Sequence, residues 1–244
     1  MRFDIITIFP ELIQSVCNCS IIKRAIEKGI IEVNTIDFRD YAFDKHKHVD
    51  DYAYGGGAGM LISVQPVHQA LVTVPNVEKA YKMITSPTGT KFNQEVAERL
   101  SKLDHIVIVC GHYEGIDARI NDYMDEEISL GDYILTGGEL GACVLIDAVS
   151  RLVPGVITDA SIQDESFTTG LLEYPQYTRP YEYDGKKVPD VLISGHHANI
   201  KKWQRFESLK QTYHKRPDLL DNIELSKEDL KYLEMIKNNE ELKF

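Results

Sequence analysis

The sequence lacks long hydrophobic runs, paired cysteines and paired zinc ligands. The apolar N-terminal stretch RFDIITIFPELI is interrupted by Arg2, Asp4 and Glu11, which argues against a signal peptide or a membrane span. The four cysteines include no C-x-x-C pair and the eight histidines include no H-E-x-x-H motif, so we expect reduced thiols and no zinc site. These absences predict a cytoplasmic protein with no membrane partner and no metal-binding motif.

Motifs for binding nucleoside triphosphates are also missing. The glycine-rich stretch YGGGAGM (54–60) has no following Lys-Ser/Thr, and no G-x-G-x-x-G follows an apparent strand. We interpret its glycines as residues that permit positive φ in tight turns.

The net charge of -11 gives no overall attraction to nucleic acid. The exception is the segment 195–217, which reads as one helix closed by Pro217. Six Lys or Arg against Glu207 give this segment a charge of +5 and leave -16 for the rest. Any nucleic-acid contact should therefore be local, although a solvated face of an amphipathic helix would have the same composition.

The 244 residues suit one large domain, or a medium domain with a small one. Strands are expected at 2–9, at 30–38, where apolar and polar residues alternate, at 80–86 and at 105–111. The last is an unbroken apolar run, typical of a strand buried on both faces of a parallel sheet, and one or two short strands are expected within 126–135. Helices are expected at 21–28 (capped by Ser20 and ended by Gly29), 64–73, 93–102, 116–124, 139–153 and 226–238 (capped by Ser226). This alternation predicts an α/β fold with a mostly parallel sheet. Irregular structure is expected from residue 156 to 190.

Three glycine-containing turns each follow an apolar strand: SPTG (86–89), CGHYEG (110–115) and TGGEL (136–140). Ligands of open α/β sheets bind outside the carboxyl ends of the strands. Glycines let a ligand approach the backbone closely, and these turns contain no basic side chain to hold a polyphosphate. The pattern therefore favours a nucleoside-like ligand of low charge.

Six stretches together resemble the bacterial tRNA (guanine-N1)-methyltransferases, a family of the trefoil-knotted SPOUT class. They are DYAYGGGAGM, ITSPTG, VCGHYEGID, GDYILTGGEL, LIDAVSRLVPGV and GLLEYPQYTRP. The resemblance implies a knotted catalytic domain over 1–158, a flexible linker over 159–174 and a helical tRNA-binding domain over 175–244. It also implies a homodimer.

The resemblance implies S-adenosylmethionine as the methyl donor, and it raises Mg2+ as a second ligand. The implied cofactor-binding residues are Ser86, Pro87, Gly111, Tyr113, Leu130, Gly131, Asp132, Tyr133, Ile134, Leu135, Gly137 and Gly138. They belong to the same three turns that the strand ends single out.

The implied reaction methylates N1 of the guanosine immediately 3′ of the tRNA anticodon. N1 carries a proton, so a general base is required. The family uses an Asp before Ser-Phe in the linker. Alignment on Ser166-Phe167 places Glu165 there, with Asp164 one residue earlier, and we favour Glu165 narrowly. Arg151 is expected to contact the guanine, and Glu114 to assist.

Binding of the tRNA anticodon stem-loop is assigned to Asp50 and to the basic helix. The helix residues concerned are Lys201, Lys202, Arg205, Lys215 and Arg216. Three alternatives stay open: an RNA-binding protein without catalysis, a methyltransferase acting on a ribose 2′-hydroxyl, and a nucleotide-binding phosphotransferase. The methylated nucleoside would distinguish the first two, and the ligand bound would identify the third.

Overall fold

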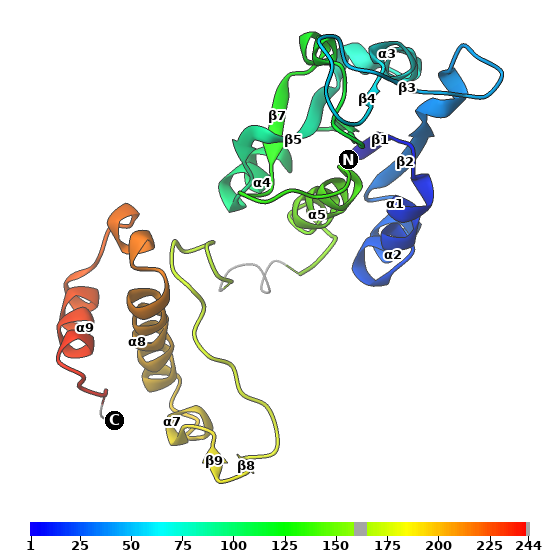
Figure 1. Ribbon diagram of the computed structural model, residues 1–244. Helices are drawn as coiled ribbons and strands as arrows, with labels where there is room; N and C mark the ends of the chain where they lie inside the picture. The colour runs from blue at the N-terminus through cyan, green and yellow to red at the C-terminus, as the bar shows by residue number, and fades with distance from the viewer. Residues whose placement is uncertain (159–164, 243–244) are drawn as a thin grey trace. The chain divides into compact units, whose positions relative to one another are not determined.

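Five parallel strands form the sheet at the centre of the N-terminal part of the chain (Figure 1). They are β1 (Arg2–Thr7), β2 (Glu32–Asp37), β5 (Tyr81–Lys91), β6 (His105–Val109) and β7 (Glu126–Ser129). Their order across the sheet is β2-β1-β6-β5-β7, and every neighbouring pair is parallel. The α/β fold with a mostly parallel sheet is thus confirmed.

The computed structural model describes residues 1–158 and 165–242. The chain divides into two compact units, Met1–Thr158 and Asp159–Phe244. Within the described residues, no helix is both long and apolar enough to cross a membrane.

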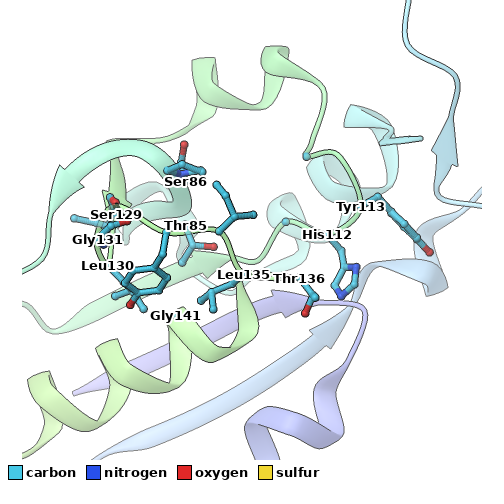
Figure 2. Close-up of a pocket in the computed structure, with 18 of the residues that line it drawn as sticks. Thr85, Ser86, His112, Tyr113, Ser129, Leu130, Gly131, Leu135, Thr136 and Gly141 are labelled. Carbon is cyan, nitrogen blue, oxygen red and sulfur yellow. Dashed lines mark hydrogen bonds between the residues drawn. The ribbon is translucent and has the colours of Figure 1, made fainter. Parts of the chain in front are cut away.

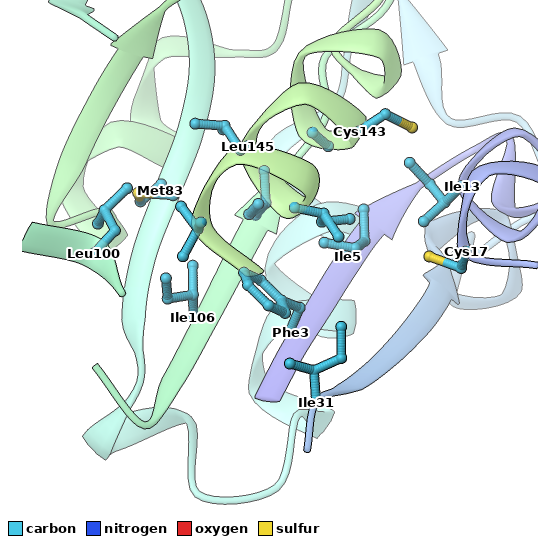
Figure 3. Packing of buried hydrophobic residues seen from close by; sticks show 14 of the residues in the cluster. Phe3, Ile5, Ile13, Cys17, Ile31, Met83, Leu100, Ile106, Cys143 and Leu145 are labelled. Atoms are coloured by element: carbon cyan, nitrogen blue, oxygen red, sulfur yellow. The ribbon is translucent and has the colours of Figure 1, made fainter. Parts of the chain in front are cut away.

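Both faces of the sheet are buried. Successive side chains of a strand point to opposite sides, so one strand contributes residues to the core on each face. Phe3, Ile106 and Ile108 face one hydrophobic cluster, whereas Val107 and Val109 face another. The first cluster lies under α1 (Pro10–Cys17), α2 (Ser20–Glu27), α4 (Gln94–Leu100) and α5 (Glu139–Ser150) (Figure 3). The second lies under α3 (Val64–Thr73) and two 3₁₀ helices, η1 (Phe38–Tyr41) and η3 (Ala118–Tyr123). Burial on both sides explains the unbroken apolar runs of these strands.

Three local predictions need correction. Ser20 is not a helix cap, because Cys19 precedes α2 and Ser20 itself is the first helical residue. The predicted helix at 116–124 is the 3₁₀ helix η3. The stretch 126–135 contains one strand that ends at Ser129, and its apolar continuation DYIL is a loop. Apolar residues in that loop line a cavity described below, so their pattern imitates a buried strand.

The second unit is mainly helical. It contains α7 (Asp190–Ile193), α8 (His197–Lys215), the 3₁₀ helix η4 (Pro217–Asn222), α9 (Lys227–Lys237) and a hairpin of β8 (Glu182–Tyr183) with β9 (Lys186–Lys187). Phe206 and Leu209 of α8 pack against Tyr232, Leu233 and Ile236 of α9. Ser226 caps α9 as predicted, in a reciprocal capping box with Asp229.

Candidate functional site

A cavity of about 430 Å³ lies where β6 and β7 end and α5 begins, beside an irregularity in the middle of β5 (Figure 2). Its described lining comes from three segments of the chain, 85–87, 111–115 and 128–138 without Asp132, together with Gly141. The cavity is at the carboxyl edge of a parallel sheet, the usual place for a ligand in an α/β fold.

The first wall is an excursion from β5. The pairing register with β7 shifts between Thr85 and Thr90, so residues 86–89 leave the ladder. Thr88 anchors the excursion by donating its hydroxyl to Glu127 Oε2 at 2.9 Å, and its Oγ1 lies 2.7 Å from the Ser86 hydroxyl. A side chain at Gly89 would collide with the backbone of Glu127, since its Cβ would lie 2.4 Å from that carbonyl carbon. Ser86 and Pro87 are thereby held at the cavity rim.

The second wall is a tight turn after β6, in which the Gly115 amide donates to the His112 carbonyl at 3.1 Å. Tyr113, inside this turn, has φ of +58°. This left-handed conformation is energetically unfavourable for any residue except glycine, and residues held in it are found most often at functional sites. The next residue, Glu114, supplies the only carboxylate among the described lining residues.

The third wall is the loop from Leu130 to Gly138, which leads into α5. The Gly138 amide donates to the Gly111 carbonyl at 2.8 Å, so this loop and the second wall are in direct contact. A Cβ on Gly138 would lie 2.1 Å from Thr85 Oγ1 and 2.9 Å from Cys110 Cα. Only glycine fits here, because the backbone of Cys110 and Gly111 and the side chain of Thr85 crowd around it.

Polar groups in the wall are few and partly unpartnered. Among the described residues, Thr85 Oγ1 and His112 Nδ1 are buried without a hydrogen-bond partner. Buried polar atoms normally have partners, so a ligand atom could supply one here. No Lys or Arg lines the cavity within the described residues, and the pKa of the neighbouring Cys110 thiol is raised well above its usual value by burial. This environment suits a nucleoside with backbone hydrogen bonds and disfavours a polyphosphate.

The structure brings together almost all the residues that the resemblance assigned to the cofactor. Asp132 is the exception: its side chain is 94% exposed and lies 3.7 Å from Lys91 Nζ. Sequence reasoning missed Thr85, His112, Gly115, Ile128, Ser129, Thr136 and Gly141. Most of them directly adjoin the assigned residues, and Gly141 follows Gly138 by one helical turn, so the helical period could have identified it.

Apart from Glu114, the residues assigned to catalysis and to tRNA lie outside this cavity lining. Arg151 follows the last turn of α5 and is half-buried, and Asp50 pairs with Ile62 in a short antiparallel ladder. Glu165 belongs to the second unit. Asp164 lies outside the described residues. Across the described part of the chain, no group of three His, Cys, Asp or Glu side chains is arranged to hold a metal ion.

The basic residues of α8 have different surroundings. Lys201 and Lys202 are exposed and lie near the N-terminal end of α8, before the buried Phe206 and Leu209. Arg205 instead forms a two-bond ion pair with Asp229, at 2.7 and 2.9 Å. Two further contacts are also within the unit: Lys215 donates to Gln211 and Arg216 pairs with Asp218. Lys201 and Lys202 are therefore the cations of the described helix most available to an external anion.

Comparison with known proteins gives a consistent result. The family model described as tRNA (Guanine-1)-methyltransferase TrmD matches residues 1–222. A Clostridium perfringens (strain SM101 / Type A) protein named tRNA (guanine-N(1)-)-methyltransferase is 54% identical over 234 residues, covering 96% of this chain and 99% of that protein. Proteins of the same name from Staphylococcus haemolyticus (strain JCSC1435) and Dictyoglomus turgidum (strain DSM 6724 / Z-1310) are similar. The first is 51% identical, covering 98% of this chain and 100% of its own length, and the second is 50% identical, covering 97% of each.

Proposed function

Because this chain belongs to the tRNA (guanine-1)-methyltransferase family and is a tRNA-modifying enzyme of that class, we propose that it methylates N1 of the guanosine immediately 3′ of the anticodon, with S-adenosylmethionine as donor. The observation that carries this proposal is the cavity at the sheet edge, which is walled by backbone and lacks a basic side chain among its described residues.

The residues around the cavity suit the proposed donor. Gly111, Gly137 and Gly138 line the cavity without side chains that would fill it, and Thr85 Oγ1 and His112 Nδ1 are buried groups in need of partners. The volume of about 430 Å³ lies within the range of small-molecule sites. When bound, S-adenosylmethionine supplies a methyl group already activated by its sulfonium charge. The role of the protein is then to hold donor and acceptor in line.

Proton removal from guanine N1 is assigned to Glu165. A carboxylate accepts this proton as N1 becomes the nucleophile. Glu165 is one methylene longer than the Asp of the family pattern, and Asp164 is the alternative base.

Arg151 is assigned to stabilise negative charge that develops on O6, since a cation is most effective where charge appears in the transition state. Glu114 is assigned an assisting role from its place in the cavity lining. Mg2+, which the resemblance raises as a second ligand and which no motif requires, is tested by activity in EDTA.

Recognition of tRNA is assigned to Asp50 and to the second unit, with residues 159–174 as the linker. The exposed Lys201 and Lys202 would contact phosphates, while Arg205 stabilises the unit through Asp229. The reacting base must leave its stack to expose N1.

We also assign the trefoil knot and the homodimer to this chain. The contacts of Gly138 with Thr85, Cys110 and Gly111 support a chain threaded tightly at this point. An exposed stripe on α5 supports a subunit interface: Leu140 and Val144 are 51% and 46% exposed, and Ile134 of the preceding loop is 79% exposed. Apolar side chains that share one helix face are typical of a contact with another chain.

The test is to incubate the purified protein with unmodified tRNA and S-adenosylmethionine, digest the tRNA and identify its nucleosides by mass spectrometry. N1-methylguanosine restricted to tRNAs with guanosine after the anticodon would support the proposal. A 2′-O-methyl product, or no product, would contradict it.

The base is tested with Glu165→Gln and Asp164→Asn. We expect Glu165→Gln to lower kcat by at least a hundredfold, the lower end of general-base effects, with the Kd of the cofactor within twofold of wild type. If Asp164→Asn is the damaging change instead, the base lies one residue earlier.

A further inference from the structure

The glycine-rich stretch 54–60 is a loop between β3 (Asp50–Asp51) and β4 (Leu61–Ile62), which pair antiparallel and close its base. Four of its glycines have positive φ: Gly55, Gly56, Gly57 and Gly59. Their sequence interpretation as turn glycines is therefore confirmed. The sequence interpretation gave all four glycines the same role, but their surroundings in the structure differ.

The far end of this loop is attached to the second wall of the cavity. The Glu114 amide donates to the Met60 carbonyl at 3.1 Å, and the Ile62 amide donates to the Gly115 carbonyl at 2.9 Å. The Asp117 amide in turn donates to the Ile62 carbonyl at 2.9 Å. These bonds fix the backbone of residues 60–62 against that of residues 114–117.

Gly59 lies directly against the side chain of Glu114. A Cβ at this position would be 2.4 Å from Glu114 Cγ and 2.6 Å from Oε1. Gly55, Gly56 and Gly57 have nothing within 4 Å of the corresponding point. Of these four glycines, only Gly59 is therefore required both for its positive φ and because a side chain there would collide with Glu114.

We propose that Gly59 is a positioning residue that sets where the Glu114 carboxylate lies in the cavity. If a methyl group were added at Gly59, one of the two contacting parts would have to move. The backbone of the loop is tied down by the bonds above, whereas a Glu side chain rotates readily. The carboxylate would therefore move, and the cavity would lose its described carboxylate from this place. The consequence for catalysis rests on the role of Glu114 in the proposed function.

Gly59→Ala and Gly56→Ala form a matched pair of variants. The two glycines have φ of +83° and +80°, so alanine introduces the same backbone strain at each. They differ in that only Gly59 touches Glu114. With wild-type enzyme as reference, we expect Gly59→Ala to lower kcat for tRNA methylation by at least tenfold, and Gly56→Ala to leave it within twofold. Equal effects of the two variants would overturn the proposal.

Double variants with Glu114→Gln separate positioning from general damage. If Gly59 acts through Glu114, adding Gly59→Ala to Glu114→Gln should change kcat less than twofold. Multiplication of the two single effects would mean that Gly59 acts by another route, and would overturn the proposal.

Crystal structures of the two glycine variants give a readout that does not depend on activity. The Glu114 carboxylate should be displaced in Gly59→Ala and unmoved in Gly56→Ala. An unmoved carboxylate in both would refute the positioning role. Failure of the wild type to methylate tRNA would refute the proposed function, while these structures would still decide the role of Gly59.

Discussion

Gly138 is the most crowded of the glycines in the cavity wall. Its missing Cβ would meet Thr85 Oγ1, Cys110 Cα and the Gly111 amide nitrogen at 2.1, 2.9 and 3.0 Å, and two of these are backbone atoms that cannot rotate away. At Gly111, in the same cavity, the nearest atom would be Ile116 Cγ1 at the ordinary distance of 3.4 Å. Gly111 therefore provides a matched control.

We expect Gly138→Ala to lower the melting temperature by roughly 5 °C or more, because overpacking costs about 1–3 kcal/mol or more. Gly111→Ala should change it by only about 1 °C. Thermal unfolding followed by circular dichroism, without ligand, provides the measurement. Similar melting temperatures for both variants would show that the backbone around Gly138 can relax.

Sequence reasoning at this scale identified residue types better than it identified surroundings. It assigned Gly137 and Gly138 to the close approach of a ligand, whereas the atoms that crowd them in the structure belong to the protein itself, and it treated Gly59 as an ordinary turn glycine. It also assigned Arg205 to tRNA as a helix cation. The partners Glu114 and Asp229 are 55 and 24 residues away from Gly59 and Arg205 in the sequence, and only folding brings each pair together.

The start of α9 combines a helix cap with an ion pair. Hydrogen bonding from Arg205, which outweighs burial, lowers the pKa of Asp229 to about 2 from an ordinary 3.8. A carboxyl group whose pKa is lower in the folded state than in the unfolded state stabilises the fold at pH values above its unfolded-state pKa. This stabilisation is lost as the pH falls through the folded-state pKa. This contribution, roughly 2 kcal/mol, should be complete at neutral pH and be lost between about pH 4 and pH 2.

We therefore expect Asp229→Asn to destabilise the second unit at pH 7 and to have little effect near pH 2. Trp203, the single tryptophan, is in this unit, so its fluorescence during urea unfolding reports on it. Ser226→Ala removes the cap alone and should cost about 1 kcal/mol at both pH values. An Asp229→Asn effect that did not change with pH would show that the charge is unimportant.

Helix α8 contains both residues that pack in the core of its unit and exposed cations. Trp203, Phe206 and Leu209 are buried, while Lys201 and Lys202 are exposed. We expect Lys201→Glu with Lys202→Glu to raise the KM for tRNA by about tenfold. The slope of log binding constant against log salt concentration should become shallower, by the amount that about two lost phosphate contacts would cause. Lys231→Glu with Lys237→Glu, on α9, makes the same charge change in the same unit. Equal effects of both pairs would mean that overall charge controls binding.

At the scale of the whole molecule, the exposed stripe on α5 predicts assembly. Leu140→Glu with Val144→Glu should convert the proposed homodimer to monomers and abolish methylation. Val72→Glu, on the opposite face of the sheet and 51% exposed, is the control and should leave the assembly unchanged. Sedimentation velocity measures both. A dimer that survives the α5 substitutions would place the interface elsewhere.

The class of fold was predictable from the sequence, whereas its arrangement was not. Apolar runs showed that strands such as β1 and β6 are buried on both faces, which suffices for a parallel α/β sheet. Strand order depends on contacts between distant residues, on which local patterns carry no information. The loop after Ser129 was read as strand for a related reason, since apolar residues that line a cavity have the composition of a core strand.

The strand order also has a consequence in time. One edge of β1 pairs with β2, but its other edge pairs with β6, with Arg2 opposite His105. At about 5–20 residues per second, a ribosome needs roughly 5–20 s to make the intervening chain. For that interval a nascent β1 has an unpaired edge, which is the kind of surface that invites pairing with other chains. Synonymous codon changes that slow translation between β2 and β6 would lengthen this exposure without altering the amino-acid sequence of the finished protein.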